Sequence, residues 1–178
     1  MKNLFVTLSL ILMTSCVSYV SLTKNYKESI IKESVINSNS YWDNIIDFFA
    51  ENGIPIKNMD KQSGLIISDE FTIPTKYITG ENENGNLINP NAWIASGYWN
   101  NGPYKLGPHG DLIPKCKVTF VVRIRQDVNA KIFVNLNVLD CNHFFKGNGT
   151  LPSHTWEFND VQSTGVFEKE LIQRIINK

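Results

Sequence analysis

The first stretch with apolar residues at helical spacing follows a run of Ser and Asn. In it Trp42, Ile45 and Phe49 recur every three or four positions, and Gly53 stands at the end. Such a stripe predicts an amphipathic helix, and glycine suits the left-handed conformation of a helix C-cap. We therefore predict a helix over 40–52.

A second helical stripe closes the chain. Phe167, Leu171 and Ile175 recur every four residues, and the Ser-Thr pair at 163–164 offers side chains that cap a helix N-terminus. This pattern predicts a helix over 165–176.

Between these helices, apolar and polar residues alternate with the period of a half-buried strand. The alternation is clearest over 117–125 and 131–139, and it predicts an antiparallel hairpin in which Val118 pairs with Val138. A third strand is expected at 154–158.

The opposite face of this hairpin is polar and is expected to be wet. Such a row could recognise an anion, although a simply solvated face is commoner. The residues concerned are Arg123, Arg125, Asn135 and Asn137.

Shorter apolar patterns precede the hairpin. A strand starts at 54–56, and residues 65–73 predict another that Pro74 ends. The sequence DKQSG at 60–64 predicts a turn between them. Short connections favour antiparallel pairing. We therefore expect an α+β domain over 40–178, with a sheet of about four to five strands and both helices packed on one face.

Residues 75–115 form a long loop in this scheme, rich in Gly, Asn and Pro and without clear period. The segment could be an ordered functional loop, an excursion over the sheet with a short strand, or a mobile lid. Its aromatic side chains could bind a glycan or protein, or they could pin the loop onto the sheet, which is commoner. These candidate binding residues are Trp93, Tyr98, Trp99 and Tyr104.

Composition fits one folded domain without a nucleic-acid partner. The 178 residues are 42% apolar and carry a formal net charge of zero, so nothing attracts nucleic acid as a whole. The histidines 109, 143 and 154 do not match zinc spacing, and no G-x-S-x-G motif marks a nucleophile. We expect no cofactor, no metal and a binding module rather than an enzyme.

The first sixteen residues differ from the rest of the chain. Lys2 gives a positive start, residues 4–13 are mostly apolar, and small residues lead into Cys16. A segment of this kind is typical of a secretory signal peptide, and its apolar run is too short to span a bilayer.

The sequence MTSC at 13–16 resembles a bacterial lipobox. The resemblance implies a signal peptide over 1–15 and lipid attachment at Cys16, where two acyl chains give stable membrane anchoring. Because Val17 follows in place of the Asp of an inner-membrane retention signal, we expect the outer membrane, facing the periplasm. A plain signal peptide with a chance cysteine is the alternative.

Polar residues then dominate 16–39, and we expect this segment to be a flexible tether. The alternatives are a short helix or an added strand formed by its apolar residues Ile30, Ile31, Val35 and Ile36.

Cys116 and Cys141 stand near the open ends of the predicted hairpin. An oxidising periplasm favours a disulfide between them. The predicted register sets Cys116 beside Asp140, so the pair needs a bulge, or Cys141 beyond the strand end. Two buried free cysteines are the alternative.

Two motifs, DK-x-SG at 60–64 and STG-x-x-E at 163–168, resemble those of small bacterial outer-membrane lipoproteins. A looser likeness is to the helix-grip domains of accessory lipoproteins in outer-membrane protein assembly. The resemblance implies a lipid-anchored cell-envelope binding or scaffold module, whose partner is the membrane and an envelope protein or glycan. The alternative is an envelope hydrolase acting on glycan or peptide, with its site around 75–115.

Overall fold

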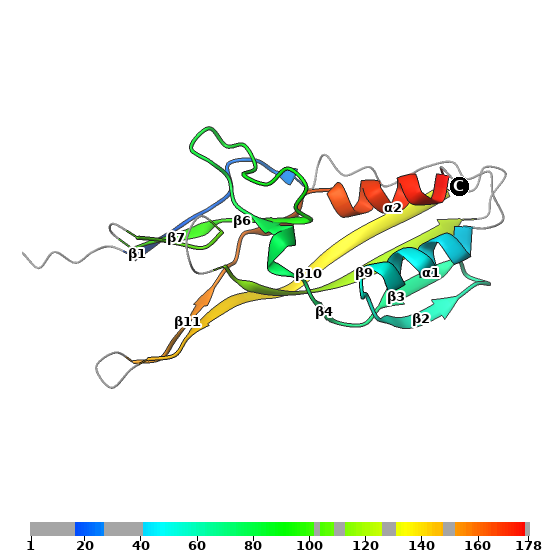
Figure 1. The fold of residues 1–178 in the computed structure, drawn as a ribbon, viewed down its shortest axis with the longest axis horizontal. Helices are drawn as coiled ribbons and strands as arrows, with labels where there is room; N and C mark the ends of the chain where they lie inside the picture. Colours follow the sequence, from blue (N-terminus) through cyan, green and yellow to red (C-terminus); the bar gives the residue numbers. More distant parts are fainter. Residues whose placement is uncertain are drawn as a thin grey trace, which may run out of the picture.

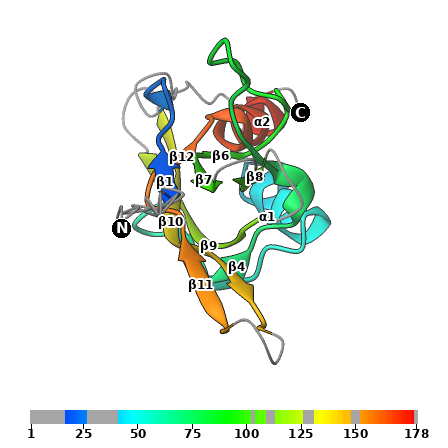
Figure 2. The same ribbon diagram turned by 90° about the vertical axis from the view of Figure 1, so that its left-hand side faces the viewer.

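The computed structural model of the chain has an α+β fold in which α-helices cover one face of a largely antiparallel sheet (Figures 1 and 2). This confirms the predicted fold class, but the main sheet has six strands rather than four to five. The structure describes residues 17–26, 41–101, 104–108, 113–125, 131–147 and 152–176.

The main sheet has the order β11-β10-β9-β3-β2, and the short strand β4 also pairs with β9. Each of these described pairings is antiparallel. The long strands β9 and β10 form the centre of the sheet, as the alternation of apolar residues predicts. The strands are β2 (Ile56–Asp60), β3 (Leu65–Ser68), β4 (Phe71–Thr72), β9 (Lys115–Arg125), β10 (Lys131–Phe145) and β11 (His154–Glu157).

Helices α1 (Tyr41–Glu51) and α2 (Val166–Ile176) confirm the predicted helices to within a residue. Their apolar stripes and one face of the sheet enclose the core. Phe120 of β9 lies at its centre, with its ring 4.1 Å from that of Phe167 on α2 and 6.1 Å from that of Phe49 on α1. The helices are therefore fixed by apolar packing across the sheet.

The turn between β2 and β3 follows the DKQSG sequence. Asp60 accepts a hydrogen bond from the backbone N–H of Gln62, and Gly64 has a φ of +73°. A β-carbon on Gly64 would stand 1.9 Å from the carbonyl oxygen of Ile124. Only glycine therefore allows this turn to lie against β9. The predicted strand 65–73 is divided, because the chain leaves the ladder between β3 and β4.

The STG-x-x-E sequence fixes the start of α2. Ser163 accepts a hydrogen bond from the N–H of Gly165 and donates to the carboxylate of Glu168 at 2.8 Å. Glu168 is fully buried, and it also accepts from the N–H of Leu136 on β10. Burial raises the pKa of Glu168 above its usual value, against the opposing effect of these hydrogen bonds. The motif thus joins the helix to the sheet.

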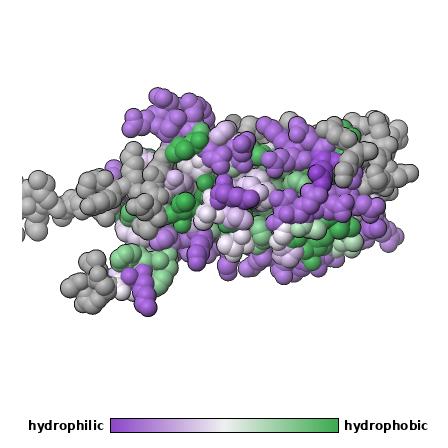
Figure 3. Space-filling model, in the orientation of Figure 1, coloured by the Kyte–Doolittle hydropathy of each residue, from purple (hydrophilic) through white to green (hydrophobic). Residues whose placement is uncertain are grey.

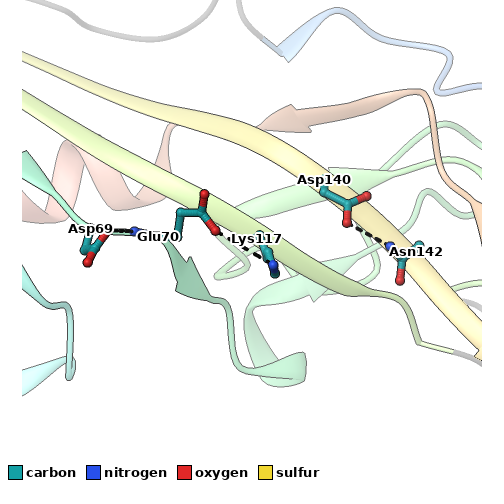
Figure 4. A network of polar contacts seen from close by, with 5 residues as sticks. All are labelled: Asp69, Glu70, Lys117, Asp140 and Asn142. Atoms are coloured by element: carbon teal, nitrogen blue, oxygen red, sulfur yellow. Dashed lines mark hydrogen bonds and ion pairs between the residues drawn. The ribbon is translucent and has the colours of Figure 1, made fainter.

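The hairpin register is the predicted one, with Val138 opposite Val118. A bulge then shifts the register between Val138 and Asp140, so that Cys141 lies opposite Cys116. Figure 4 shows the polar side of this region, where Lys117 forms an ion pair with Glu70 at 3.8 Å. The bulge turns Cys141 into the core, which is one of the two arrangements that the sequence left open for pairing the cysteines.

Residues 75–115, expected to be a long loop, contribute strands to two smaller sheets in their described parts. The first has the order β12-β6-β5, and the second has the order β1-β7-β8. A short 3₁₀ helix, η2 (Thr75–Tyr77), leads into them. The strands are β1 (Val17–Val20), β5 (Ile78–Thr79), β6 (Ile94–Ser96), β7 (Tyr98–Asn101), β8 (Tyr104–Leu106) and β12 (Val161–Ser163).

The expected tether over 16–39 does not hold for its described part, residues 17–26. Val17–Val20 forms the strand β1, which pairs antiparallel with β7 through four residue pairs. The sequence alternatives of a short helix or an added strand were based on Ile30, Ile31, Val35 and Ile36, which lie outside the described residues, so they are not tested. Residues 27–40 lie outside the described residues.

Candidate functional site

The predicted lipid-attachment residue, Cys16, lies outside the described residues. Its neighbour Val17 is the first residue that the structure describes, and it begins β1. The candidate site consists of the N-terminal segment, defined as residues 17–26, and the surface around it.

Glu81 holds the far half of the N-terminal segment. Its carboxylate accepts hydrogen bonds from the N–H and hydroxyl of Thr23, both at 2.7 Å, from the N–H of Lys24 and from the hydroxyl of Tyr26 at 2.7 Å. Four donors from one short segment thus converge on a single carboxylate. Burial opposes the charge of Glu81, but these bonds outweigh burial and hold its pKa below the usual value.

Residues just before α2 hold the same segment from the other side. The carboxylate of Asp160 accepts from the N–H of Leu22 at 2.7 Å, and Gln162 accepts from the N–H of Tyr26 at 2.9 Å. The hydroxyl of Tyr19 accepts from the backbone N–H of Asp160. Burial raises the pKa of this tyrosine above its usual value. The segment is therefore bound along its length.

Gly97 lets β1 come close to the domain. A β-carbon at this position would stand 2.4 Å from the carbonyl oxygen of Val20 and 2.7 Å from the hydroxyl of Tyr19. Contacts this short do not occur in folded proteins, so a side chain at residue 97 would displace β1. The N-terminal segment is thus an integral part of the fold.

Aromatic side chains gather where β1 begins. Trp99 of β7 lies opposite Tyr19 in the ladder, with their ring centres 5.1 Å apart, and its ring centre is 5.4 Å from that of Trp156 on β11. The indole N–H of Trp99 donates to the carbonyl of Glu157 at 2.8 Å. A hollow of about 650 Å³ at this surface is lined by Val17, Trp99, His154 and Trp156 among others.

The alternation of side chains along β10 and β11 extends this surface. Phe145 lies opposite His154, and His143 lies opposite Trp156, so these pairs share one face of the ribbon. Phe145 is 38% exposed. Figure 1 shows the β10–β11 ribbon and the start of β1 at the same end of the molecule, away from α1. We define the aromatic face as Val17, Trp99, Phe145, His154 and Trp156.

The sequence-predicted loop aromatics have different environments. Trp93 is 1% exposed and stacks on Tyr77 at 3.8 Å, so its proposed role in binding is wrong and it pins residues 75–115 onto the core. Tyr98 is partly buried beside a second hollow, of about 320 Å³, that Glu81 also lines. Of the three whose side chains the structure describes, only Trp99 belongs to the aromatic face. The side chain of Tyr104 lies outside the described residues.

Cys116 and Cys141 have their sulfur atoms at disulfide-bonding distance, and their Cα atoms are 4.0 Å apart. Both side chains are buried, at 0% and 4% exposure. The pair therefore joins the central strands β9 and β10 beside the bulge, as the predicted disulfide would require.

The polar face of the hairpin is exposed to solvent as expected. Arg123 and Arg125 are exposed, and the guanidinium of Arg125 lies 5.3 Å from the centre of the Phe133 ring. Asn135 donates its side-chain N–H to Asn137 on the same strand. These contacts are made within the sheet itself and indicate a solvated surface.

Within the ranges that the structure describes, no group of three or more His, Cys, Asp and Glu side chains could hold a metal ion. No helix in the same residues is long and apolar enough to cross a membrane. No family model matches this chain, and no curated protein matches its sequence.

Sequence reasoning missed Glu81, Gly97, Trp156 and Asp160. Each acts through contacts with residues 17–26 or with β7, which are remote in sequence. Glu81 stands in a polar stretch where a carboxylate is usually solvated, so no local signal marked it. Trp156 stands in a stretch that predicts an ordinary strand, so its position did not distinguish a surface residue from a structural one.

Proposed function

We propose that this chain is a lipid-anchored protein of the bacterial cell envelope, on the outer membrane and facing the periplasm, whose domain acts as a binding or scaffold module. The observation that supports it most is the N-terminal segment. It follows the lipobox-like MTSC sequence directly, and it is bound into the domain by β1 and by Glu81. A lipid anchor at Cys16 would therefore be joined directly to the folded domain.

The interior of the domain supports a binding role more than a catalytic one. The space between helices and sheet is filled by a continuous apolar cluster, while aromatic side chains remain partly exposed at the β10–β11 end. A filled core with an exposed aromatic surface is typical of a protein that offers a surface to a partner. An envelope protein or a glycan remains the proposed further partner.

A hydrolase would need two carboxylates, or a serine and a histidine, free to act in a cleft. The hollow beside Tyr98 is lined by Glu81 and Glu83. Glu81, however, already accepts four hydrogen bonds from the N-terminal segment, so its oxygen atoms are used in holding that segment. This geometry favours a structural role for Glu81.

Mass spectrometry of the protein purified from bacterial membranes tests the anchor. We expect a mature chain that starts at Cys16 and carries acyl chains on its sulfur and its amine. The variant Cys16→Ser should keep residues 1–15 or lose them without gaining acyl mass. A wild-type chain without acyl mass in the membrane fraction would overturn the proposal.

A further inference from the structure

The position of the proposed lipid relative to the aromatic face is set by covalent geometry. Cys16 precedes Val17 directly, and consecutive Cα atoms are about 3.8 Å apart. Val17 is 43% exposed and lines the same hollow as Trp99 and Trp156. Acyl chains on Cys16 would therefore leave the protein next to the aromatic face, an argument that depends on the proposed lipidation.

No free spacer stands between that lipid and the domain. Val17 is paired with Asn101, and Thr23 is held by Glu81. A lipid on a long flexible tether leaves a domain free to tumble, whereas a lipid on the first residue before a fixed strand restricts its orientation. The surface next to Cys16 must then lie close to the bilayer.

The chemistry of the aromatic face suits the interface between headgroups and acyl chains. Trp and Tyr rings are enriched at that depth because they combine an apolar body with a polar group. The indole N–H of Trp99 is already bonded to the carbonyl of Glu157, so its ring can enter an apolar layer without leaving that donor unpaired. Phe145 adds an exposed ring at the ribbon tip, at 38% exposure.

Charge plays a small part in this surface. Lys146 follows Phe145, while Glu157 faces the hollow, so the nearby charges are of both signs. The contact should therefore depend on aromatic insertion and not on attraction to anionic lipid.

We propose that the aromatic face rests on the bilayer that holds the acyl chains of Cys16, and that it fixes the orientation of the domain on the membrane. Figure 1 places β1 and β11 at one end of the molecule and α1 at the other. Figure 3 shows apolar residues towards both ends of this view. The end with β1 is the one that follows Cys16 directly in the chain. The helix-covered end then points into the aqueous phase, where a partner can reach it.

Quenching of tryptophan fluorescence by brominated lipids tests this contact. The acylated protein is reconstituted into neutral vesicles whose phospholipids carry bromine on the acyl chain near the headgroup. Trp99 and Trp156 should be quenched, while Trp42 and Trp93, at 8% and 1% exposure in the core, should not. The double variant Trp99→Phe/Trp156→Phe should lose most of the quenching, and 0.5 M salt should leave wild-type quenching unchanged within error.

Trp42→Phe is the matched control, because it removes a tryptophan from α1 at the opposite end and should leave the quenching in place. Flotation of the same vesicles separates the two proposals. Protein that does not float has no lipid anchor, and the proposed function fails. Protein that floats without quenching has its anchor but holds this face away from the bilayer, which overturns the present inference. Cross-links between copies through the unquenched face would assign it to a second copy.

Discussion

The two ends of the molecule are held together by different forces. At one end α1, α2 and the main sheet share an apolar core around Phe120, and burying a large apolar side chain contributes about 1.5–3 kcal/mol. At the other end short strands and the carboxylates of Glu81 and Asp160 hold residues 17–26. A typical hydrogen bond contributes only about 0.5–1.5 kcal/mol net. The first end should therefore set global stability, and the second should open locally.

The largest effect is expected where the two ends meet, at Trp93. Its ring contacts Phe120 and Phe167 of the core as well as Tyr77. Trp93→Ala should lower the free energy of unfolding in urea by about 4 kcal/mol, the usual cost of removing a fully buried large ring. Trp99→Ala, on the partly exposed aromatic face, should cost about 1 kcal/mol.

Trp93→Phe is the matched control, because it keeps a ring in the same site and should recover most of the loss. Equal destabilisation by Trp93→Ala and Trp99→Ala would show that the two ends do not differ in the way proposed.

Removal of the cysteine pair should have the next largest effect. The two residues are 25 positions apart. In the loop-entropy model, a cross-link that closes a loop of this length raises the free energy of the unfolded chain by about 3.5 kcal/mol. The double variant Cys116→Ala/Cys141→Ala should lower the urea midpoint accordingly. A reducing agent should lower the midpoint of wild type and leave the variant unchanged. A wild type that does not respond to reductant would indicate two free thiols.

These differences also explain which parts of the structure could be predicted from sequence. The helix bounds and the pairing of Val118 with Val138 follow from the spacing of apolar residues in each segment, because one side of each element is buried in the core. The bulge before Cys141 is one of the two arrangements that the register and the cysteine pair left open, and the structure selects it over a Cys141 beyond the strand end. Where packing on the core determines an element, its own sequence carries the information.

The opposite holds for the end that contains β1. Val17 pairs with Asn101, and β12 pairs with β6, across separations that no local pattern reports. These strands have three or four residues, too few to show alternation. β10 also continues to Phe145, beyond the predicted end at 139, because β11 pairs with its last residues. Tertiary pairing therefore decided the parts that the sequence left as tether and loop.

Glu81→Gln tests the polar end directly. The amide keeps the shape of the side chain but removes its charge and one acceptor, so local opening of residues 17–26 should become easier by about 1–2 kcal/mol. Hydrogen exchange at the N–H groups of Thr23 and Lys24, which donate to Glu81, should accelerate by about tenfold. Exchange in β9 should stay unchanged, and a uniform acceleration throughout the chain would contradict local opening.

The pH dependence of the two buried carboxylates should have opposite signs. The pKa of Glu81 is lowered in the folded state, so its contribution is present above the unfolded value of about 4.3 and is lost as the pH falls through the folded pKa. The pKa of Glu168 is raised by burial, so its contribution is present below the unfolded value and is lost as the pH rises through the folded pKa. The free energy of unfolding should be measured from pH 3 to 7. The loss of stability at low pH that comes from Glu81 should be absent in Glu81→Gln, and the loss at higher pH that comes from Glu168 should be absent in Glu168→Gln.

The smallest effect is expected from a charged pair at the helix-covered end. Arg174 of α2 donates to Glu51 of α1, and the carboxylate side chain is 54% exposed. Exposed ion pairs contribute about 0–1 kcal/mol, and salt screens them. Glu51→Gln should therefore change the free energy of unfolding by less than about 0.5 kcal/mol, and 1 M salt should abolish the difference. A loss comparable to that of Trp93→Ala would mean that charge, and not the core, joins the two helices.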